Sequence, residues 1–258
     1  MSTNVFTAFP KMDYTREFLA DQEKARIGQK IPRRLLITYA NLGELFKKAT
    51  TENPTRFLGL GRGVEESSLE FSSDIKTVTD IFGNSETTIN HIEITQNFSP
   101  VTLRVGSELH KVMFQILDEK DLDRLSMFEI LVVKAFWGQE INGKFYFPAE
   151  LHLNSTIAPQ SFGGDHHIDL PINTYPSNDK LIGWADIEDD DDGNKIATFY
   201  KVGGSVPDAP TFTRVTNPSN PKTSGLYELV STGEYALSAD TTASAEKTYY
   251  SCSSAQAA

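Results

Sequence analysis

The residue types most able to bind a metal ion gather in GGDHHIDL, residues 163–170. Asp165, His166, His167 and Asp169 all carry side chains that ligate divalent metals. Adjacent strand residues point to opposite faces, so His166 and His167 cannot share one ion without a kink. His167 and Asp169 do share a face, but a site there needs ligands from another element. We therefore expect a surface strand after a Gly-Gly bend, with a metal site completed from elsewhere as the alternative.

A run of carboxylates occupies residues 186–192, where six of the seven positions are acidic. Aligned as a calcium loop on Gly193, it places Phe199 at the twelfth position, where a bidentate glutamate is required. This excludes an EF-hand. Asp192-Gly193 matches a two-residue hairpin turn between two strands, with the carboxylates at its solvated tip. Weak cation binding at that tip stays open as an alternative.

Motifs for phosphate binding and for nucleophilic catalysis are incomplete or missing. GLGRG at residues 59–63 begins like GxGxxG but has Val64 where the third glycine belongs, and no Lys-Ser/Thr follows. The sequence contains neither GxSxG nor HExxH. Its single cysteine, Cys252, excludes an internal disulfide framework. We therefore expect no catalytic activity and no cofactor.

Charge and hydropathy narrow the classes of partner. The net charge of -11 over 258 residues makes the protein repel nucleic acid rather than bind it. No segment approaches the roughly 18 apolar residues of a membrane helix, and the N-terminal residues lack the layout of a signal peptide. We expect a protein that neither inserts into a membrane nor passes through a secretion channel.

The pattern along the chain is rich in strands and turns, with one amphipathic helix. The helix is predicted from a stripe of 3.6-residue period, and such a stripe must pack against an apolar partner. Its predicted packing residues are Leu109, Val112, Met113, Ile116 and Leu117. Residues 127–136 follow as a strand that is apolar on nearly both faces, as expected for a buried central strand.

Residues 72–96 predict a long two-stranded ribbon. Ser, Thr and Asp alternate there with Ile and Val around Phe82-Gly83-Asn84. We expect both faces of this ribbon to be mostly polar, and a polar two-stranded ribbon is not stable by itself. The ribbon is therefore expected to be mobile in the isolated chain.

Composition divides the chain near residue 205. Residues 1–34 are polar and are predicted to be an N-terminal arm of the first domain, 1–205. After Val206 four prolines fall within 20 residues, which indicates a linker or extended loop. Residues 206–258 are thus predicted to be this linker, a small β appendage and a disordered tail. We expect the appendage to project outward and to be unnecessary for assembly.

The order of these parts resembles the major tail proteins, or tail tube proteins, of long-tailed bacteriophages, especially those of Gram-positive hosts. The resemblance covers roughly residues 35–200 and depends on element order and composition. The segments that carry it are FLGLGRGVEESSLEF, TVTDIFGNSETTINHIEIT, SPVTLRVGSELHKVMFQILDEKDLDRLSMFEILVVKAF, SFGGDHHIDLPINTY and LIGWADIEDDDDGNKIATFYK. The long N-terminal arm and the C-terminal extension depart from the family pattern.

The resemblance implies a β-sandwich or barrel-like core with one flanking helix, in a chain that forms stacked, hexameric rings. The stacked rings would be the tail tube through which DNA leaves the capsid. The implied partners are other copies of the chain together with the tape measure, tail terminator and distal tail proteins. The implied location is the virion tail, after assembly in the host cytoplasm, and DNA would pass through without specific binding.

Within this hypothesis, the ribbon is the segment that needs a neighbouring subunit. Its strand propensity is not matched by an apolar face large enough to hold it on its own subunit. The predicted interface residues are Thr79, Asp80, Ile81, Phe82, Gly83, Asn84 and Ile89.

Two other classes of function stay open from the sequence. One is a carbohydrate- or host-surface-binding β-module, for which the appendage offers Tyr227, Tyr235, Tyr249 and Tyr250. The other is a glycan-cleaving enzyme, which needs two carboxylates at a defined separation in a cleft.

Overall fold

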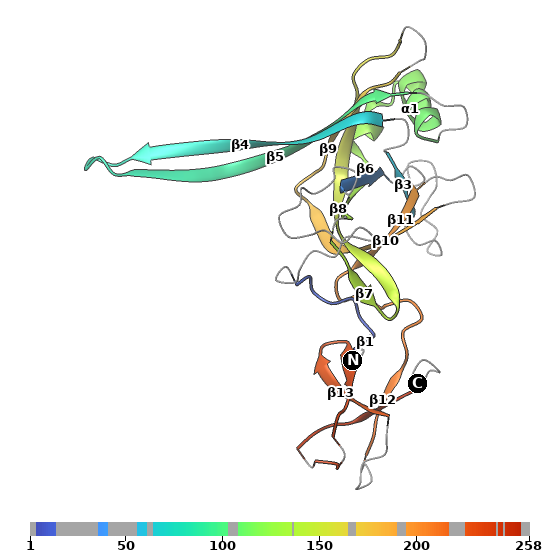
Figure 1. Cartoon of the computed structure of the whole chain (residues 1–258). Helices are drawn as coiled ribbons and strands as arrows, with labels where there is room; N and C mark the ends of the chain where they lie inside the picture. Colours follow the sequence, from blue (N-terminus) through green and yellow to red (C-terminus); the bar gives the residue numbers. More distant parts are fainter. Residues whose placement is uncertain are drawn as a thin grey trace.

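The structure, a computed structural model, describes most of the chain. The described residues are 4–13, 36–40, 56–60, 64–102, 108–135, 137–164, 169–189, 195–216, 225–240, 242–244 and 246–253. The strands are β1 (Val5–Phe6), β2 (Leu36–Ala40), β3 (Arg56–Gly59), β4 (Val64–Thr79), β5 (Ser85–Val101), β6 (Phe128–Lys134), β7 (Gln139–Ile141), β8 (Lys144–Pro159), β9 (Ile172–Tyr175), β10 (Lys180–Asp189), β11 (Lys195–Lys201), β12 (Phe212–Arg214), β13 (Leu226–Ser231), β14 (Glu234–Leu237) and β15 (Tyr250–Cys252). The helices are α1 (Glu108–Glu119) and a short 3-10 helix, η2 (Leu122–Ser126). The predicted mainly β fold with one α-helix is confirmed for these residues (Figure 1).

Six strands pair in a closed ring. β8 pairs with β6 along one edge and with β10 along the other, and the remaining pairings run β6 to β2, β3, β11 and β10. Side chains from five of these strands meet inside the ring: Phe57, Leu131, Val133, Phe147, Ala149, Leu151, Ala185 and Ala197. At Gly183 in β10 a Cβ atom would lie 2.2 Å from the carbonyl oxygen of Tyr200, so this close strand approach requires glycine.

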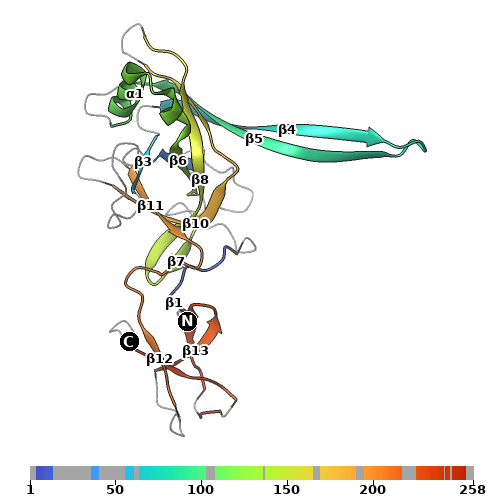
Figure 2. The same ribbon diagram turned by 180° about the vertical axis from the view of Figure 1, so that it is seen from behind.

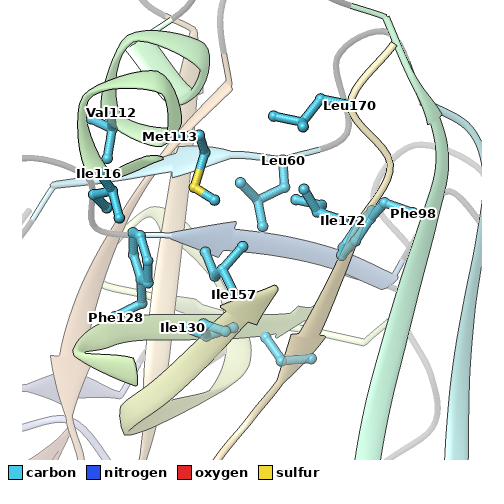
Figure 3. Close-up of a cluster of buried hydrophobic side chains, with 11 residues drawn as sticks. Leu60, Phe98, Val112, Met113, Ile116, Phe128, Ile130, Ile157, Leu170 and Ile172 are labelled. Carbon is cyan, nitrogen blue, oxygen red and sulfur yellow. The ribbon is translucent and has the colours of Figure 1, made fainter. Parts of the chain in front are cut away.

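The second half of β8 leaves the ring and begins another layer. Residues 156–159 of β8 pair with β9, β9 pairs with β5, and β5 pairs with β4. Helix α1 covers the space between this layer and β6 (Figure 3). The cluster beneath it contains Leu60, Phe98, Val112, Met113, Ile116, Phe128, Ile130, Val132, Ile157, Leu170 and Ile172.

β6 separates two hydrophobic clusters. Ile130 and Val132 face the helix side, whereas Leu131 and Val133 face the interior of the ring. The sequence-based expectation that this strand is apolar on both faces is confirmed, because each face has its own core.

The predicted helix stripe is only partly the buried one. Val112, Met113 and Ile116 are buried. Leu109 is helical, but its side chain lies outside the described atoms. Leu117 is 37% exposed, so its assignment to the packed face was wrong. It follows Ile116 by one residue, a rotation of about 100° that carries it past the edge of the buried face.

The C-terminal strands form a separate five-stranded sheet in the order β1-β14-β13-β15-β12. Two findings change the predicted organisation of this region. The N-terminal strand β1 belongs to this sheet, with Val5 opposite Tyr235. In addition, residues 206–216 are not a linker, because Val206 is 4% exposed and residues 212–214 form β12. Prolines favour extended backbone, and extended backbone can pack or pair at a sheet edge as well as link domains.

The N-terminal segment ties this sheet to the barrel. Phe6 has its backbone N–H and C=O both bonded by the side-chain amide of Asn142, at 2.8 and 2.7 Å. Phe9 is 2% exposed and stacks on Tyr200 with ring centroids 4.8 Å apart. Trp184 donates its indole N–H to the carbonyl oxygen of Pro10 at 2.8 Å. Within the described ranges, neither helix has the length and hydropathy of a transmembrane segment.

Candidate functional site

The ribbon formed by β4 and β5 projects from the body of the molecule (Figures 1 and 2). Its strands stay paired from the body to the tip, ending at Thr79 opposite Ser85. Hydroxyl groups bond across the strands, with Thr77 and Thr87 oxygens 3.2 Å apart and Thr79 and Ser85 oxygens 2.9 Å apart. Every residue from 70 to 93 is exposed.

The two faces of the ribbon differ in chemistry. Opposite residues of an antiparallel pair point to the same face, so the register assigns each side chain. One face carries the apolar residues Phe71, Ile75, Ile89, Ile92 and Ile94 among Ser and Thr. The other carries Glu70, Asp74, Lys76, Glu86, His91 and Glu93. Over residues 72–96 both faces are mostly polar, as expected, but apart from Val78 the apolar residues of the two paired strands gather on one of them.

The apolar face consists of large side chains open to solvent. Phe71 is 63% exposed, Ile75 and Ile89 are each 58% exposed, and Ile92 is 42% exposed. Contiguous exposed apolar surface of this kind marks an interaction site. On the described residues β4 pairs only with β5, so the backbone groups of its outer edge also face solvent.

The tip of the ribbon is held in one shape by Asp80. Its carboxylate accepts hydrogen bonds from the N–H groups of Phe82 and Asn84, at 2.9 and 2.8 Å, and from the Asn84 amide at 3.1 Å. These bonds, the Asn84 side-chain amide first, lower the pKa of Asp80 below its ordinary value. Gly83 takes the positive φ of +83° that the turn requires. Ile81 and Phe82 are thereby presented to solvent, 94% and 83% exposed.

The structure places the residues that the sequence predicted for an interface on this ribbon, all but Ile89 at its end. Thr79, Asp80, Ile81, Phe82, Gly83 and Asn84 form the end of the ribbon, and Ile89 lies on its apolar face. Sequence reasoning missed Phe71, Ile75 and Ile92, which extend this surface toward the body. The spacing of Ile92 and Ile94 was the available signal, since residues two apart in a strand share a face.

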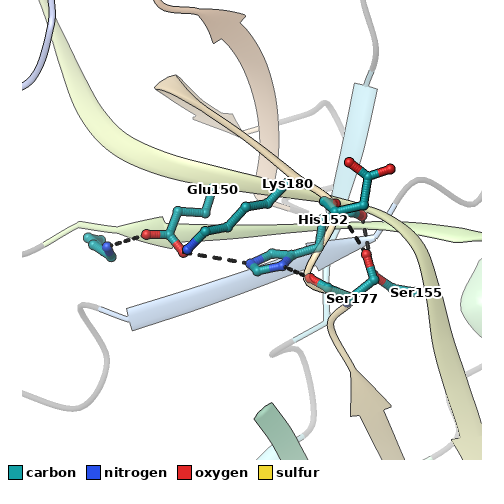
Figure 4. Close-up of polar contacts among 7 residues, drawn as sticks. Glu150, His152, Ser155, Ser177 and Lys180 are labelled. Atoms are coloured by element: carbon teal, nitrogen blue, oxygen red, sulfur yellow. Dashed lines mark hydrogen bonds and ion pairs between the residues drawn. The ribbon is translucent and has the colours of Figure 1, made fainter. Parts of the chain in front are cut away.

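A partly buried polar network is the second candidate (Figure 4). Glu150 on β8 accepts from Lys134 of β6 at 2.7 Å and from Lys180 of β10 at 3.0 Å. His152 is 2% exposed, with its Nδ1 2.6 Å from the Ser177 carbonyl oxygen and its Nε2 3.7 Å from Glu150. The network therefore links three adjacent strands on the outside of the barrel.

The geometry of this network is that of a structural brace. The hydroxyl of Ser155 donates to the His152 carbonyl oxygen at 3.3 Å, and it accepts from the Ser177 N–H at 3.1 Å. Both of these hydrogen bonds join the hydroxyl to backbone groups. A nucleophilic serine instead needs a hydrogen bond to a base such as the histidine ring. Burial raises the pKa of Glu150, but hydrogen bonds from Lys134 and Lys180 outweigh it, and the net pKa is lowered. Burial lowers the pKa of His152 below its ordinary 6.5.

The predicted metal and cation segments lie partly outside the described residues. Asp165, His166 and His167 belong to that undescribed part, while Asp169 pairs with Gly163 through backbone bonds of 3.0 and 3.2 Å. Residues 190–194, which include the predicted Asp192-Gly193 turn, also lie outside the described residues. On either side of them, β10 and β11 pair up to Asp189 opposite Lys195. Among the described residues no group of three His, Cys, Asp or Glu side chains could hold a metal ion.

The beginning of the acidic run is neutralised by lysines. Asp186 is 6% exposed and forms an ion pair with Lys144, which also contacts Glu188 at 3.0 Å. Burial raises the pKa of Asp186, although Lys144 opposes this effect. At the strand end, Asp189 pairs with Lys195 at 2.7 Å. The part of GLGRG that the structure describes, Gly59 and Leu60, lies at the end of β3, with Leu60 in the helix-side cluster.

The tyrosines of the C-terminal sheet pack largely on one another. Tyr249 and Tyr227 are 1% and 6% exposed. Tyr235 stacks on Phe212 at 3.9 Å, and Tyr250 meets the edge of Tyr235 at 5.2 Å. These rings form an aromatic core of a small sheet, so they offer little open ring surface to a sugar.

Comparison with known proteins adds no assignment. No model of a known protein family matches the sequence, and no curated protein matches it.

Proposed function

We propose that this chain is a structural protein that assembles with copies of itself into stacked, hexameric rings, forming the tail tube of a long-tailed bacteriophage. The observation that carries the proposal is the exposed apolar face of the projecting ribbon. A free monomer gains nothing from holding four large apolar side chains of this face in solvent, whereas a neighbouring subunit can bury them.

The shape of the ribbon supports contact between subunits. On β4 every residue from Glu70 to Thr79 is exposed, and at about 3.4 Å per residue this stretch spans roughly 30 Å. An arm of that length reaches a second subunit. The outer edge of β4 also offers a ladder of backbone groups to which a neighbouring strand can be added.

The electrostatics suit a conduit for DNA. A net charge of -11 disfavours nucleic-acid binding, so DNA can move past the protein without being held. The proposal includes the tape measure, tail terminator and distal tail proteins as partners, the virion tail as location, and no catalytic role.

Electron microscopy of the purified full-length chain over a range of concentrations tests this proposal. We expect rings or tubes with a constant inner diameter, and a growing share of large particles in sedimentation velocity as concentration rises. A protein that remains monomeric from micromolar to millimolar concentration would refute self-assembly. A discrete dimer without rings would refute the tube.

A further inference from the structure

A second exposed apolar surface lies on the helix side of the molecule. Phe114 of α1 is half-buried, and its ring meets that of Phe162 edge to face, with centroids 5.4 Å apart. Phe162 is 59% exposed, and Leu117, one helical turn after Phe114, is 37% exposed. We call these three residues the helix-side patch. Two further large apolar residues follow α1 in the sequence and are exposed: Leu122, the first residue of η2, at 60%, and Met127, directly after η2, at 59%.

The helix-side patch and the ribbon tip lie on opposite sides of the molecule. In both views the ribbon extends to one side of the body and α1 lies on the other (Figures 1 and 2). The tip therefore cannot reach the patch of its own chain. A second copy placed beside the first can bring its own patch to that tip.

We infer that the tip residues Ile81 and Phe82 of one copy dock on the helix-side patch of the next copy. This inference deepens the proposed self-assembly and rests on it. Two different surfaces meet in such a contact, so a pair of copies still has one free patch on the first copy and one free tip on the second. A contact of this heterologous kind closes into a ring or continues as a filament, whereas a contact between two identical surfaces stops at a dimer.

The chemistry of the two surfaces agrees with this pairing. The tip is preorganised by the Asp80 hydrogen bonds, so docking requires little further ordering of Ile81 and Phe82. Aromatic anchors that enter an apolar surface supply most of the association energy in protein interfaces. Phe82 on one side and the Phe114–Phe162 pair on the other are such anchors.

Two double variants and a matched control test the inference. The tip variant is Ile81→Ser with Phe82→Ser, and the patch variant is Leu117→Ser with Phe162→Ser. The control, Leu229→Ser with Val230→Ser, removes two residues of the C-terminal sheet whose exposures, 48% and 58%, are comparable to those of Leu117 and Phe162 in the patch variant. Thermal melts by circular dichroism establish that each variant is folded, as expected for exposed positions.

Sedimentation velocity then measures assembly of each variant alone and of mixtures. We expect the tip and patch variants each to need at least tenfold higher concentration than wild type to assemble, and the control to assemble like wild type. An equimolar mixture of the tip and patch variants should form a one-to-one dimer at concentrations where each variant alone is monomeric, because one intact tip and one intact patch can then meet.

The outcomes separate this inference from the proposed function. If wild type and the patch variant assemble equally, self-assembly stands and docking on the helix-side patch is refuted. If the mixture of tip and patch variants stays monomeric, the pairing of these two surfaces is likewise refuted. If wild type never assembles, both proposals fall.

Discussion

Ile75 and Ile89 lie directly opposite each other across the ribbon, next to the position where Asn90 is inserted into β5 with no opposite residue on β4. The inserted residue resets the alternation of the strand. Ile89 and Ile92 are three residues apart and would otherwise point to opposite faces, but the bulge places them on the same face. The continuity of the apolar face thus depends on one extra residue.

Two single-residue deletions should have different effects on the ribbon. Without Asn90, His91 and Ile89 can keep their present partners, Asp74 and Ile75, in a regular ladder. Without Thr88, a regular ladder instead places Ile89 opposite Lys76, on the charged face. We expect the Asn90 deletion to assemble like wild type and the Thr88 deletion to remain folded but lose assembly. Sedimentation velocity measures both, and equal behaviour of the two deletions would show that the apolar face is not the contact.

The helix offers a contrast between adjacent residues. Ile116→Asp places a carboxylate among fully buried side chains and should cost about 4 kcal/mol or more, a large part of a typical domain stability of about 5–15 kcal/mol. Leu117→Asp, at a position that is 37% exposed, should cost about 1 kcal/mol or less. Urea unfolding followed by circular dichroism gives both values. Similar losses for the two variants would contradict the orientation of α1.

The loss of stability on C-terminal truncation should depend on the residue at which the chain is cut. Removing all residues from Val206 onward takes away a side chain that packs with Phe6, Phe9 and Trp184, so the barrel should lose about 1.5–3 kcal/mol. A chain that ends after Pro210 keeps this contact and should melt closer to wild type. Differential scanning calorimetry of the two truncations measures the difference. If both melt at the same temperature, Val206 does not contribute to the barrel.

Acid should weaken the fold through the partly buried polar network. The lowered pKa of His152 means that, as pH falls below 6.5, the unfolded chain takes up a proton that the folded protein does not. The stability contribution is therefore complete above pH 6.5 and is lost progressively below it. Glu150, whose pKa is also lowered, adds a further loss below its ordinary value of 4.5.

His152→Gln isolates the first of these steps. The free energy of unfolding, measured in urea between pH 7.5 and 5, should fall less steeply for the variant than for wild type. The difference between the two pH profiles removes the contribution of the other titrating groups, because both proteins contain them. Parallel pH profiles would show that the histidine is not kept neutral by the fold.

Local periodicity made part of this structure predictable from the sequence. The stripe over Val112, Met113 and Ile116 and the doubly apolar strand at 128–134 depend on residues close together in the chain. The hairpin tip was also predictable, because Gly83-Asn84 gives a local turn signal.

Features that depend on the alignment of distant residues could not be predicted in this way. The apolar face of the ribbon combines residues of two strands, and their alignment depends on a bulge that alternation alone does not reveal. Pairing of β1 with β14 joins segments at opposite ends of the sequence, and two residues carry too little pattern to indicate a partner. The brace around Glu150 likewise combines charges from three strands that only the closed barrel brings together.

The pairing of β1 with β14 also imposes an order on folding. Val5 and Phe6 are synthesised long before Glu234 and Tyr235, and every strand of the barrel emerges from the ribosome in between. During translation the barrel can bury Phe9 against Tyr200 as soon as β11 is made, but Val5 must wait for β14. Because pairing over such a separation is slow, an unfinished chain presents an open strand edge to chaperones and proteases. Closure of this edge makes protection of the N-terminal segment a late event that requires the C-terminal sheet.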